Sequence, residues 1–178
     1  MDAQTSNYQV RRARAADVDA IAYVHVEAWR ETYRGQMSDD VLDDPVLLPR
    51  RRRMWDAILT DPAYADRSAA VAEVHGQIVG IALTGPPRAD GTAWERQLYL
   101  LYLLRAHHGS GAADDLVGAV LDRATSACLW VADPNPRAQA FYAKTGFTPD
   151  GTTTVEDGVR EIRMTRPSRP AAPSQRDR

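Results

Sequence analysis

The part of the sequence best suited to chemistry is a run of small residues that follows an apolar strand pattern. Leu98–Leu104 is apolar at nearly every position, which is typical of a central strand covered on both faces. A loop with Gly109 and Gly111 comes next, and a helical pattern begins directly after it. Such a junction directs backbone N–H groups and the positive end of the helix dipole at one point. Because glycine has no side chain, a phosphate can come close, so we expect an anion site here.

Two common phosphate-binding motifs do not fit this loop. A Walker A loop needs Gly-Lys-Ser/Thr, and this stretch contains no lysine. The dinucleotide fingerprint needs Gly or Ala three residues after its second glycine, where this chain has Asp114, a carboxylate that would meet the pyrophosphate. A strand-to-helix turn without a ligand is the alternative, unless a second motif accompanies the loop.

A second motif follows the next strand pattern, Ala127–Val131. It has the form Asn-x-x-Ala-x-x-Phe-Tyr-x-x-x-Gly-Phe, and its residues are Asn135, Ala138, Phe141, Tyr142, Gly146 and Phe147. In order and separation, this motif and the loop His108–Ala113 resemble the two signatures of the GNAT acetyltransferase superfamily. The resemblance covers about residues 8–166. The family loop commonly begins with Gln or Arg, where this chain has His108.

The resemblance implies an N-acetyltransferase that uses acetyl-coenzyme A. In this family two neighbouring parallel strands separate at their C-terminal ends, and pantetheine pairs with the exposed backbone of the first strand. The coenzyme-binding residues that the resemblance implies are Leu101, Tyr102, Leu103, His108, Gly109, Ser110, Gly111, Ala112, Ala113, Asn135, Ala138, Phe141 and Lys144. For two of these residues a purely structural role stays open, because Asn135 before proline is also a good helix cap and Phe141 is also a typical core side chain.

Acetyl transfer needs a neutral amine, a carbonyl held close to it, and a proton for the departing thiolate. The resemblance assigns Tyr142 as general acid, since a phenol is neutral at pH 7 and can donate. It also implies that a backbone N–H of the first strand, at Leu103, polarises the thioester oxygen. Many relatives have a glutamate as base where this chain has Gln97, which cannot take a proton. The base is then Glu95, acting through water from the same strand face, or water alone.

The acceptor is expected between the first two long helices, because this segment usually shapes the acceptor pocket in the family. The expected substrate-binding residues are Trp29, Tyr33, Asp39, Asp40 and Tyr99. The carboxylates of the segment would suit a small-molecule amine, including a polycation such as an aminoglycoside-like antibiotic. The alternative is that Ser38-Asp39-Asp40 caps a helix and favours its dipole. Two further functions stay open: acetylation of a protein N-terminus or lysine, and coenzyme A binding without turnover.

The periodicity of the chain predicts the elements that position these residues. Strands are expected at Tyr8–Ala13, Ala69–Val74, Gln77–Leu83, Leu98–Leu104, Ala127–Val131, Phe147–Thr154 and Val159–Met164, and helices from Ala16–Asp19 onward and at Leu47–Thr60, Gly109–Ala124 and Pro136–Lys144, with a loop at Thr84–Gly91. This order predicts a GNAT-type α/β fold with a mixed, mostly antiparallel sheet, a splayed parallel strand pair and helices on both faces.

Length and composition limit the remaining possibilities. The 178 residues suit one domain, which we place at 8–166 between a flexible tail at 1–7 and a disordered tail at 167–178. A net charge of −2 argues against nucleic-acid binding, and no apolar run approaches the roughly 20 residues that span a bilayer. With one cysteine and no metal-ligand spacing, we expect a cytoplasmic protein without a metal. A homodimer is compatible with the resemblance, because many relatives dimerise.

Overall fold

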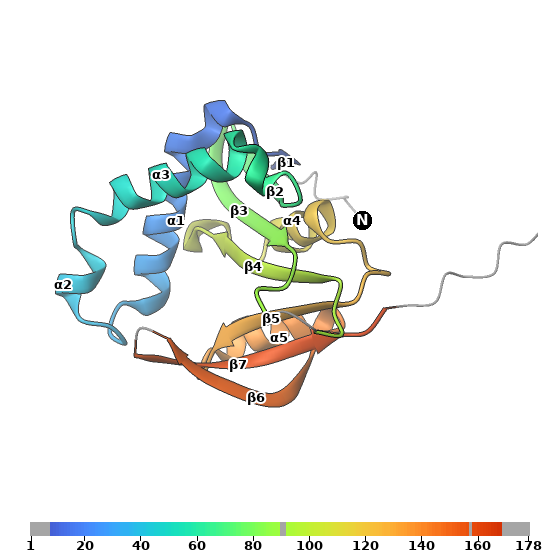
Figure 1. Ribbon diagram of the computed structural model, residues 1–178. Coiled ribbons are helices and arrows are strands. Elements are labelled where there is room, and N and C mark those ends of the chain that lie inside the picture. Colours follow the sequence, from blue (N-terminus) through green and yellow to red (C-terminus); the bar gives the residue numbers. More distant parts are fainter. Residues whose placement is uncertain (1–7, 90–91, 157, 169–178) are drawn as a thin grey trace, which may run out of the picture.

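The computed structural model describes residues 8–89, 92–156 and 158–168, so the tail predicted at 1–7 and most of the one at 167–178 lie outside the described residues. The centre of the fold is a seven-stranded sheet of order β1-β2-β3-β4-β5-β7-β6 (Figure 1). Its strands are β1 Gln9–Arg12, β2 Ser68–Val74, β3 Gln77–Gly85, β4 Arg96–Leu103, β5 Ala127–Ala132, β6 Thr148–Glu156 and β7 Val159–Arg166. The helices are α1 Val18–Tyr33, α2 Asp39–Leu42, α3 Leu47–Thr60, α4 Ala112–Val120 and α5 Pro136–Lys144.

One strand pair differs from the others in direction. β4 and β5 run parallel, and the remaining neighbours are antiparallel. The predicted mixed, mostly antiparallel sheet with a single parallel pair is therefore confirmed.

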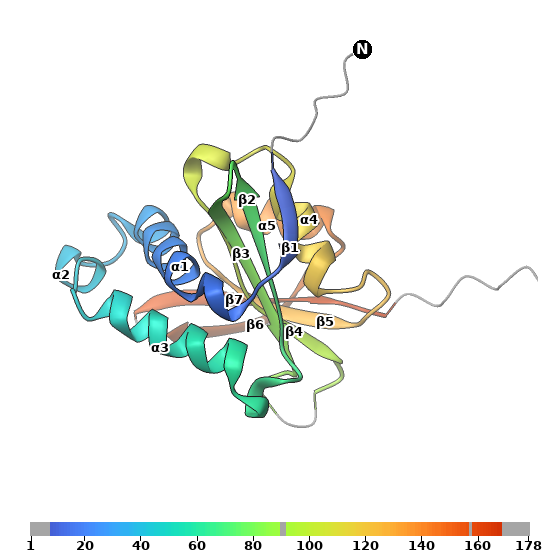
Figure 2. The same ribbon diagram turned by 90° about the horizontal axis from the view of Figure 1, so that it is seen from above.

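The helices cover the two faces of the sheet, and Figure 2 shows α1 and α3 on one side and α4 on the other. The alternation along β2 produces this arrangement, because successive side chains of a strand point to opposite faces. Ala70 and Ala72 face the core with α4 and α5, whereas Val71 faces the core with α1 and α3. Each face thus buries its own apolar cluster, and the strands between them hold the two layers together.

Several predicted boundaries were wrong. The helix predicted from Gly109 begins at Ala112, because Gly109 and Gly111 adopt positive φ, and it ends at Val120 rather than continuing to residue 124. The loop predicted from Thr84 begins later, since Thr84 and Gly85 extend β3. Thr84 is fully buried, and its hydroxyl donates to the carbonyl of Val120 at 2.9 Å. Because threonine is polar, its burial in the strand was not predicted from the sequence.

Candidate functional site

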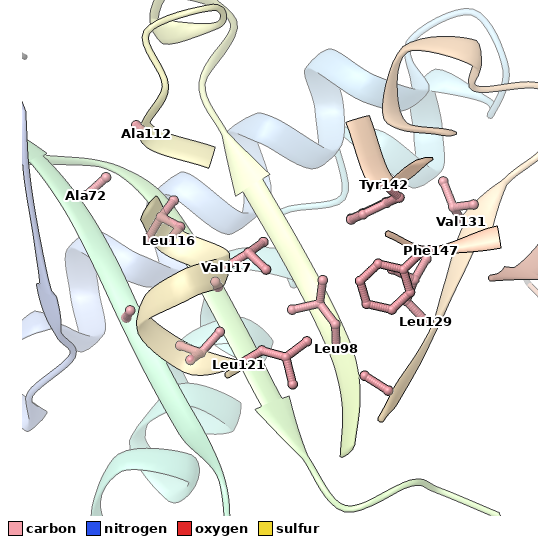
Figure 3. Close-up of a cluster of buried hydrophobic side chains, with 14 of the residues drawn as sticks. Ala72, Leu98, Ala112, Leu116, Val117, Leu121, Leu129, Val131, Tyr142 and Phe147 are labelled. Atoms are coloured by element: carbon pink, nitrogen blue, oxygen red, sulfur yellow. The ribbon is translucent and has the colours of Figure 1, made fainter. Parts of the chain in front are cut away.

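The parallel pair β4–β5 opens along its length. Its ladder consists of Arg96↔Ala127, Gln97↔Cys128 and Leu98↔Leu129, although both strands continue beyond these positions. Figure 3 shows the side chains of Tyr142 and Phe147 in the region between the diverging strands. The strands therefore have a closed end, where they pair, and an open end, where β4 from Tyr99 to Leu103 does not pair with β5.

An irregularity in β4 accompanies the opening. Leu83 pairs with Leu100 and Thr84 with Leu98, so Tyr99 is an extra residue in β4. Such a β-bulge bends its strand and increases the local twist. Both Tyr99 and Leu100 pack on the α1–α3 side, as expected where a bulge interrupts the alternation. The strand thus leaves β5 at the bulge, while it remains paired with β3 as far as Leu103.

At the closed end, polar side chains at the start of β4 are hydrogen-bonded within the chain. The carboxylate of Glu95 accepts from the hydroxyl of Ser126 at 2.9 Å and from its backbone N–H at 3.1 Å. Gln97 is buried, and its side-chain oxygen accepts from the backbone N–H of Arg88 at 3.0 Å. These bonds give Glu95 and Gln97 structural positions at the end of the pair away from the opening. The role of Glu95 as base stays a prediction, and its location does not favour that role.

At the open end, the backbone of β4 presents polar groups toward the gap in the ladder. The N–H of Leu104 donates to Val79 in β3 at 2.9 Å, so by alternation the polar groups of Leu103 and Leu101 point to the opposite edge. The carbonyl of Leu103 confirms this direction, because it contacts the Nε2 atom of His108 at 2.7 Å. Tyr102 instead contributes its side chain, which lies on the α1 side of the sheet.

The glycine loop leads into α4 at the same end. Gly109 and Gly111 have φ of 81° and 91°, values that favour glycine, and Ala112 and Ala113 form the first turn of the helix. The first backbone N–H groups of a helix have no partner within it, so they suit an anion. The hydroxyl of Ser110 donates to His107 within the loop at 2.8 Å. The predicted backbone cradle is thus present in shape, and phosphate binding by it stays a prediction.

His108 connects this loop to α5. Its Nε2 faces the carbonyl of Leu103, so Nε2 carries the proton, and its Nδ1 accepts from the guanidinium of Arg137. Burial lowers the pKa of His108, which favours this neutral form. Arg137 was not predicted from the sequence. Its position in the first turn of α5, directly after the Asn135 cap, could have indicated a cation beside the loop.

The predicted coenzyme residues on α5 have visible structural roles. The side chain of Asn135 caps the helix by accepting from the N–H of Ala138 at 3.1 Å. Ala138 and Phe141 pack against the core between α4, α5 and the sheet. Lys144 is exposed in the last turn of α5, at the opposite end from Arg137. Contacts of these residues with a coenzyme stay predictions.

Tyr142 lies at the centre of the open end. It is 8% exposed, and its ring packs edge-on against Phe141 and Phe147, with centroids 5.3 Å and 6.1 Å away. Burial raises the pKa of its phenol, and the nearby phenol of Tyr33 raises it further. The hydroxyl is therefore protonated at neutral pH, which a proton donor requires.

On the α1 side, aromatic side chains surround the open end. Trp29 and Tyr33 are half-buried in the last turns of α1, with ring centroids 5.8 Å apart. The ring of Tyr102 lies 5.2 Å from that of His25. Burial raises the pKa of Tyr33, and the carboxylate of Glu161 in β7 adds to the effect. Trp29 and Tyr33 thus lie together at the end of α1, and acceptor binding by them stays a prediction.

Other predicted acceptor residues lie in different surroundings. Asp39 contacts the guanidinium of Arg34 at 2.7 Å, and Asp43 contacts the same group at 2.8 Å. Asp39 and Asp40 lie in the first turn of the short helix α2, where they complement its dipole, but the side chain of Ser38 makes no capping hydrogen bond. The hydroxyl of Tyr99 donates to the carbonyl of Pro86, and the guanidinium of Arg67 lies over its ring. The acidic segment is therefore partly neutralised by its own chain.

Comparison with known proteins agrees with this geometry. The family described as acetyltransferase (GNAT) domain matches residues 55–167. The chain belongs to the GNAT acetyltransferase family. It is 41% identical over 106 residues to an uncharacterised N-acetyltransferase of Mycobacterium tuberculosis H37Rv, a match over 57% of this chain and 64% of that protein. It is 30% identical over 160 residues to the uncharacterised N-acetyltransferase YuaI of Bacillus subtilis, with 87% of each covered.

Solved structures share the GNAT fold. The PaiA N-acetyltransferase of Thermoplasma acidophilum, in complex with coenzyme A, superimposes with a TM-score of 0.67 at 17% identity, over 88% of this chain and 97% of that one. Within the described residues, no group of three or more His, Cys, Asp or Glu side chains is arranged to hold a metal ion. None of the helices described is long and apolar enough to cross a membrane.

Proposed function

We propose that this protein transfers the acetyl group of acetyl-coenzyme A to the primary amine of a small molecule. The observation that carries the proposal is the open end of the parallel pair. There Leu103 of β4, His108 before the glycine loop and Arg137 at the start of α5 are in contact, and Tyr142 lies between the diverging strands (Figure 3). A ligand with an amide-bearing arm and a diphosphate fits this arrangement, with the arm along β4 and the diphosphate at the glycine loop beside the start of α5.

The coenzyme would be held mainly by backbone groups. Leu101 would offer its N–H and carbonyl groups to the pantetheine arm, as a neighbouring strand would, whereas the carbonyl of Leu103 already accepts from Nε2 of His108. The loop Gly109–Ala113 would offer backbone N–H groups to the diphosphate, although those of Ser110 and Ala112 already donate to the carbonyl of His107 at 3.4 Å and to the hydroxyl of Ser110 at 3.3 Å. The guanidinium of Arg137 lies beside this loop through its contact with His108, which suits a phosphate oxygen. When bound, acetyl-coenzyme A supplies the activated acyl group and a thiolate as leaving group.

The protein's own contribution to the chemistry rests on two hydrogen-bond donors. The N–H of Leu103, directed away from β3, is positioned to polarise a thioester oxygen beside β4. The phenol of Tyr142 stays protonated because it is buried, so it can deliver a proton to the thiolate. We assign removal of the amine proton to water, since Glu95 is bonded to Ser126 at the closed end.

The surroundings of the open end favour a small acceptor. Trp29, Tyr33 and Tyr102 present half-buried aromatic surface, which suits the apolar body of a small amine. The polycation hypothesis loses support because Arg34 pairs with both Asp39 and Asp43 and so partly neutralises the acidic segment. A small amine is therefore preferred over an aminoglycoside-like antibiotic and over a protein terminus.

A thiol-release assay tests the proposal. The purified full chain is incubated with acetyl-coenzyme A and with 2-phenylethylamine, spermidine, kanamycin or a lysine-containing peptide, and products are identified by mass spectrometry. We expect thiol release and an acetylated small amine. Acetylation of the peptide alone would establish the protein-modifying alternative. Coenzyme binding by calorimetry without acetylation of any amine would indicate a binding module.

A further inference from the structure

Arg166, the last residue of β7, is a buried cation. It pairs with Ala127 of β5, and because directly paired residues share a face, its side chain lies on the core side that also holds Phe147. Arg166 is 6% exposed, and its Nε is the one buried side-chain nitrogen or oxygen without a hydrogen-bond partner in the part of the chain that the structure describes. Within the same residues no carboxylate forms a salt bridge with it. Burying a charge without a counter-ion costs free energy, which other contacts of the guanidinium must offset.

Two kinds of contact hold this guanidinium. On one side, Nη2 donates to the carbonyls of Asp122 and Thr125, at 2.7 Å and 3.3 Å, in the turn between α4 and β5. On the other side, Cζ lies 4.9 Å from the centroid of the Phe147 ring, which is a cation–π distance. Arg166 thus joins the turn after α4 to the ring of Phe147.

Phe147 in turn contacts Tyr142 directly. It is fully buried, its backbone N–H donates to the carbonyl of Tyr142 at 3.0 Å, and its ring packs edge-on against that of Tyr142 (Figure 3). Gly146, which precedes Phe147, has a φ of 91°, and an added Cβ there would lie 3.4 Å from Cδ of Arg166. A continuous series of contacts therefore leads from Arg166 to Tyr142.

The position of the Tyr142 phenol decides whether it can deliver a proton at the open end. A proton donor must lie within hydrogen-bond reach of the reacting atom, and a misplacement of about 1 Å can cost roughly 100-fold in rate. Phe141, the other ring beside Tyr142, is only partly buried. Phe147 is therefore the fixed neighbour of Tyr142, and the guanidinium on its face limits how far its ring can tilt.

We propose that Arg166 is a positioning residue: by holding the ring of Phe147, it keeps the phenol of Tyr142 in place at the open end of the parallel pair. The inference rests on the proposed function, because it concerns the proton donor of the same reaction. Arg166 touches no reacting atom and acts only through Phe147.

Ring spectra test this position without turnover. The chain contains only two phenylalanines, Phe141 and Phe147, so the full chain with ¹³C-labelled Phe and Tyr rings gives two sets of Phe signals, which a Phe141→Leu variant assigns. The wild type should show nuclear Overhauser cross-peaks between the rings of Phe147 and Tyr142, whose centroids are 6.1 Å apart. In Arg166→Met we expect these cross-peaks to weaken or disappear.

Steady-state thiol release measures the catalytic consequence, with acetyl-coenzyme A and 2-phenylethylamine, or spermidine where the wild type prefers it. Arg166→Met should lower kcat roughly tenfold and leave the KM for acetyl-coenzyme A close to that of the wild type, because the coenzyme residues are untouched. Arg166→Lys, which keeps the charge but not the planar guanidinium, should retain more of kcat. In a Phe147→Leu background, Arg166→Met should lower kcat no further, because the route to Tyr142 is already lost.

Thr84→Val is the matched control for the loss of a buried contact. Thr84 is buried, and its hydroxyl donates to the carbonyl of Val120 at the same end of α4. Urea unfolding measures the stability of each variant, and both Thr84→Val and Arg166→Met should be less stable than the wild type. Thr84→Val should keep the ring cross-peaks and the kcat of the wild type.

Unchanged ring cross-peaks or unchanged kcat in a folded Arg166→Met protein would overturn the proposal. A further loss of kcat in the Phe147→Leu background would overturn it too, because Arg166 would then act by another route. If Arg166→Met does not fold, Arg166→Lys carries the same comparison with Thr84→Val. A wild type that acetylates no amine would count against the proposed function, and the ring cross-peaks would still decide whether Arg166 places Tyr142.

Discussion

The two ends of the β4–β5 pair use the same strands in opposite ways. At the closed end, polar groups are satisfied within the chain, as in the bonds from Ser126 to Glu95 and from Arg88 to Gln97. At the open end, β4 and β5 are no longer hydrogen-bonded to each other. There His108, before the glycine loop, contacts the β4 backbone at Leu103 and the side chain of Arg137 in α5. The candidate site therefore lies where the backbone pairing between β4 and β5 ends, next to a segment where that pairing is complete.

The largest effect is expected from a glycine change at the open end. Gly109→Glu should weaken acetyl-coenzyme A binding by roughly 100-fold or more, because a carboxylate would approach the diphosphate. An added Cβ at Gly109 meets no atom within 4 Å, so steric conflict within the protein does not explain such a loss. Calorimetry measures the affinity.

Gly76→Glu is the control for this change. Gly76 has a similar φ, 78°, and equally open space, but it lies in the turn between β2 and β3. Both variants should lose about 1 kcal/mol of stability through the positive φ. Equal coenzyme affinity in the two variants would contradict the phosphate role of the loop.

Removing one hydroxyl at the open end should affect turnover alone. Tyr142→Phe is expected to lower kcat roughly 100-fold through loss of the proton donor. Its affinity for acetyl-coenzyme A should stay close to that of the wild type, since the ring remains. Tyr23→Phe, at an exposed position on α1, is the control in steady-state assays. Undiminished kcat in Tyr142→Phe would show that this end does not need the phenol.

The α1 layer beneath the open end should make the fold acid-sensitive. His25 is buried and accepts from the indole N–H of Trp55 at 3.1 Å, and burial, with a smaller effect of Arg51, lowers the pKa of His25 to about 3. Because the unfolded chain binds this proton more readily, stability is fully present above about pH 6.5 and falls as the pH drops toward 3.

Lowering the pH from 7 to 5 should reduce the free energy of unfolding by about 2 kcal/mol through His25 alone. His25→Gln keeps an acceptor for Trp55 but does not titrate, so urea unfolding of this variant should depend less on pH across the window. If the stability of both proteins depended on pH in the same way, His25 would bind its proton as readily in the folded state as in the unfolded chain.

The smallest effect belongs to the closed end. Glu95→Ala and Ser126→Ala should each lower stability by about 1 kcal/mol, and a double-mutant cycle should show that the two losses are coupled. Turnover per folded molecule should not change. A Glu95→Ala variant that folds normally but loses kcat would identify Glu95 as the base and overturn the division between the two ends.

Prediction from sequence succeeded where the signal is local. Alternating or continuous apolar residues located the strands, and paired glycines marked the turn before α4, because both depend on neighbours within a few residues. Boundaries such as the end of β3 were missed, since burial of Thr84 depends on α4, which is distant in the chain. The predicted roles of Trp29 and Tyr33 came from the family resemblance rather than from their own pattern, and they stay predictions.

The sequence by itself determined the GNAT order of elements, the glycine loop and the position of Tyr142 after the Asn135 cap. The tertiary structure decided which polar groups meet: Glu95 with Ser126, His108 with Arg137, Asp39 with Arg34, and Glu161 with Tyr33. The pairings between distant segments depend on how the strands and helices pack, whereas Asp39 and Arg34 are only five residues apart. A local pattern sets the conformation of a segment, whereas contacts between distant segments are fixed only when the whole core packs.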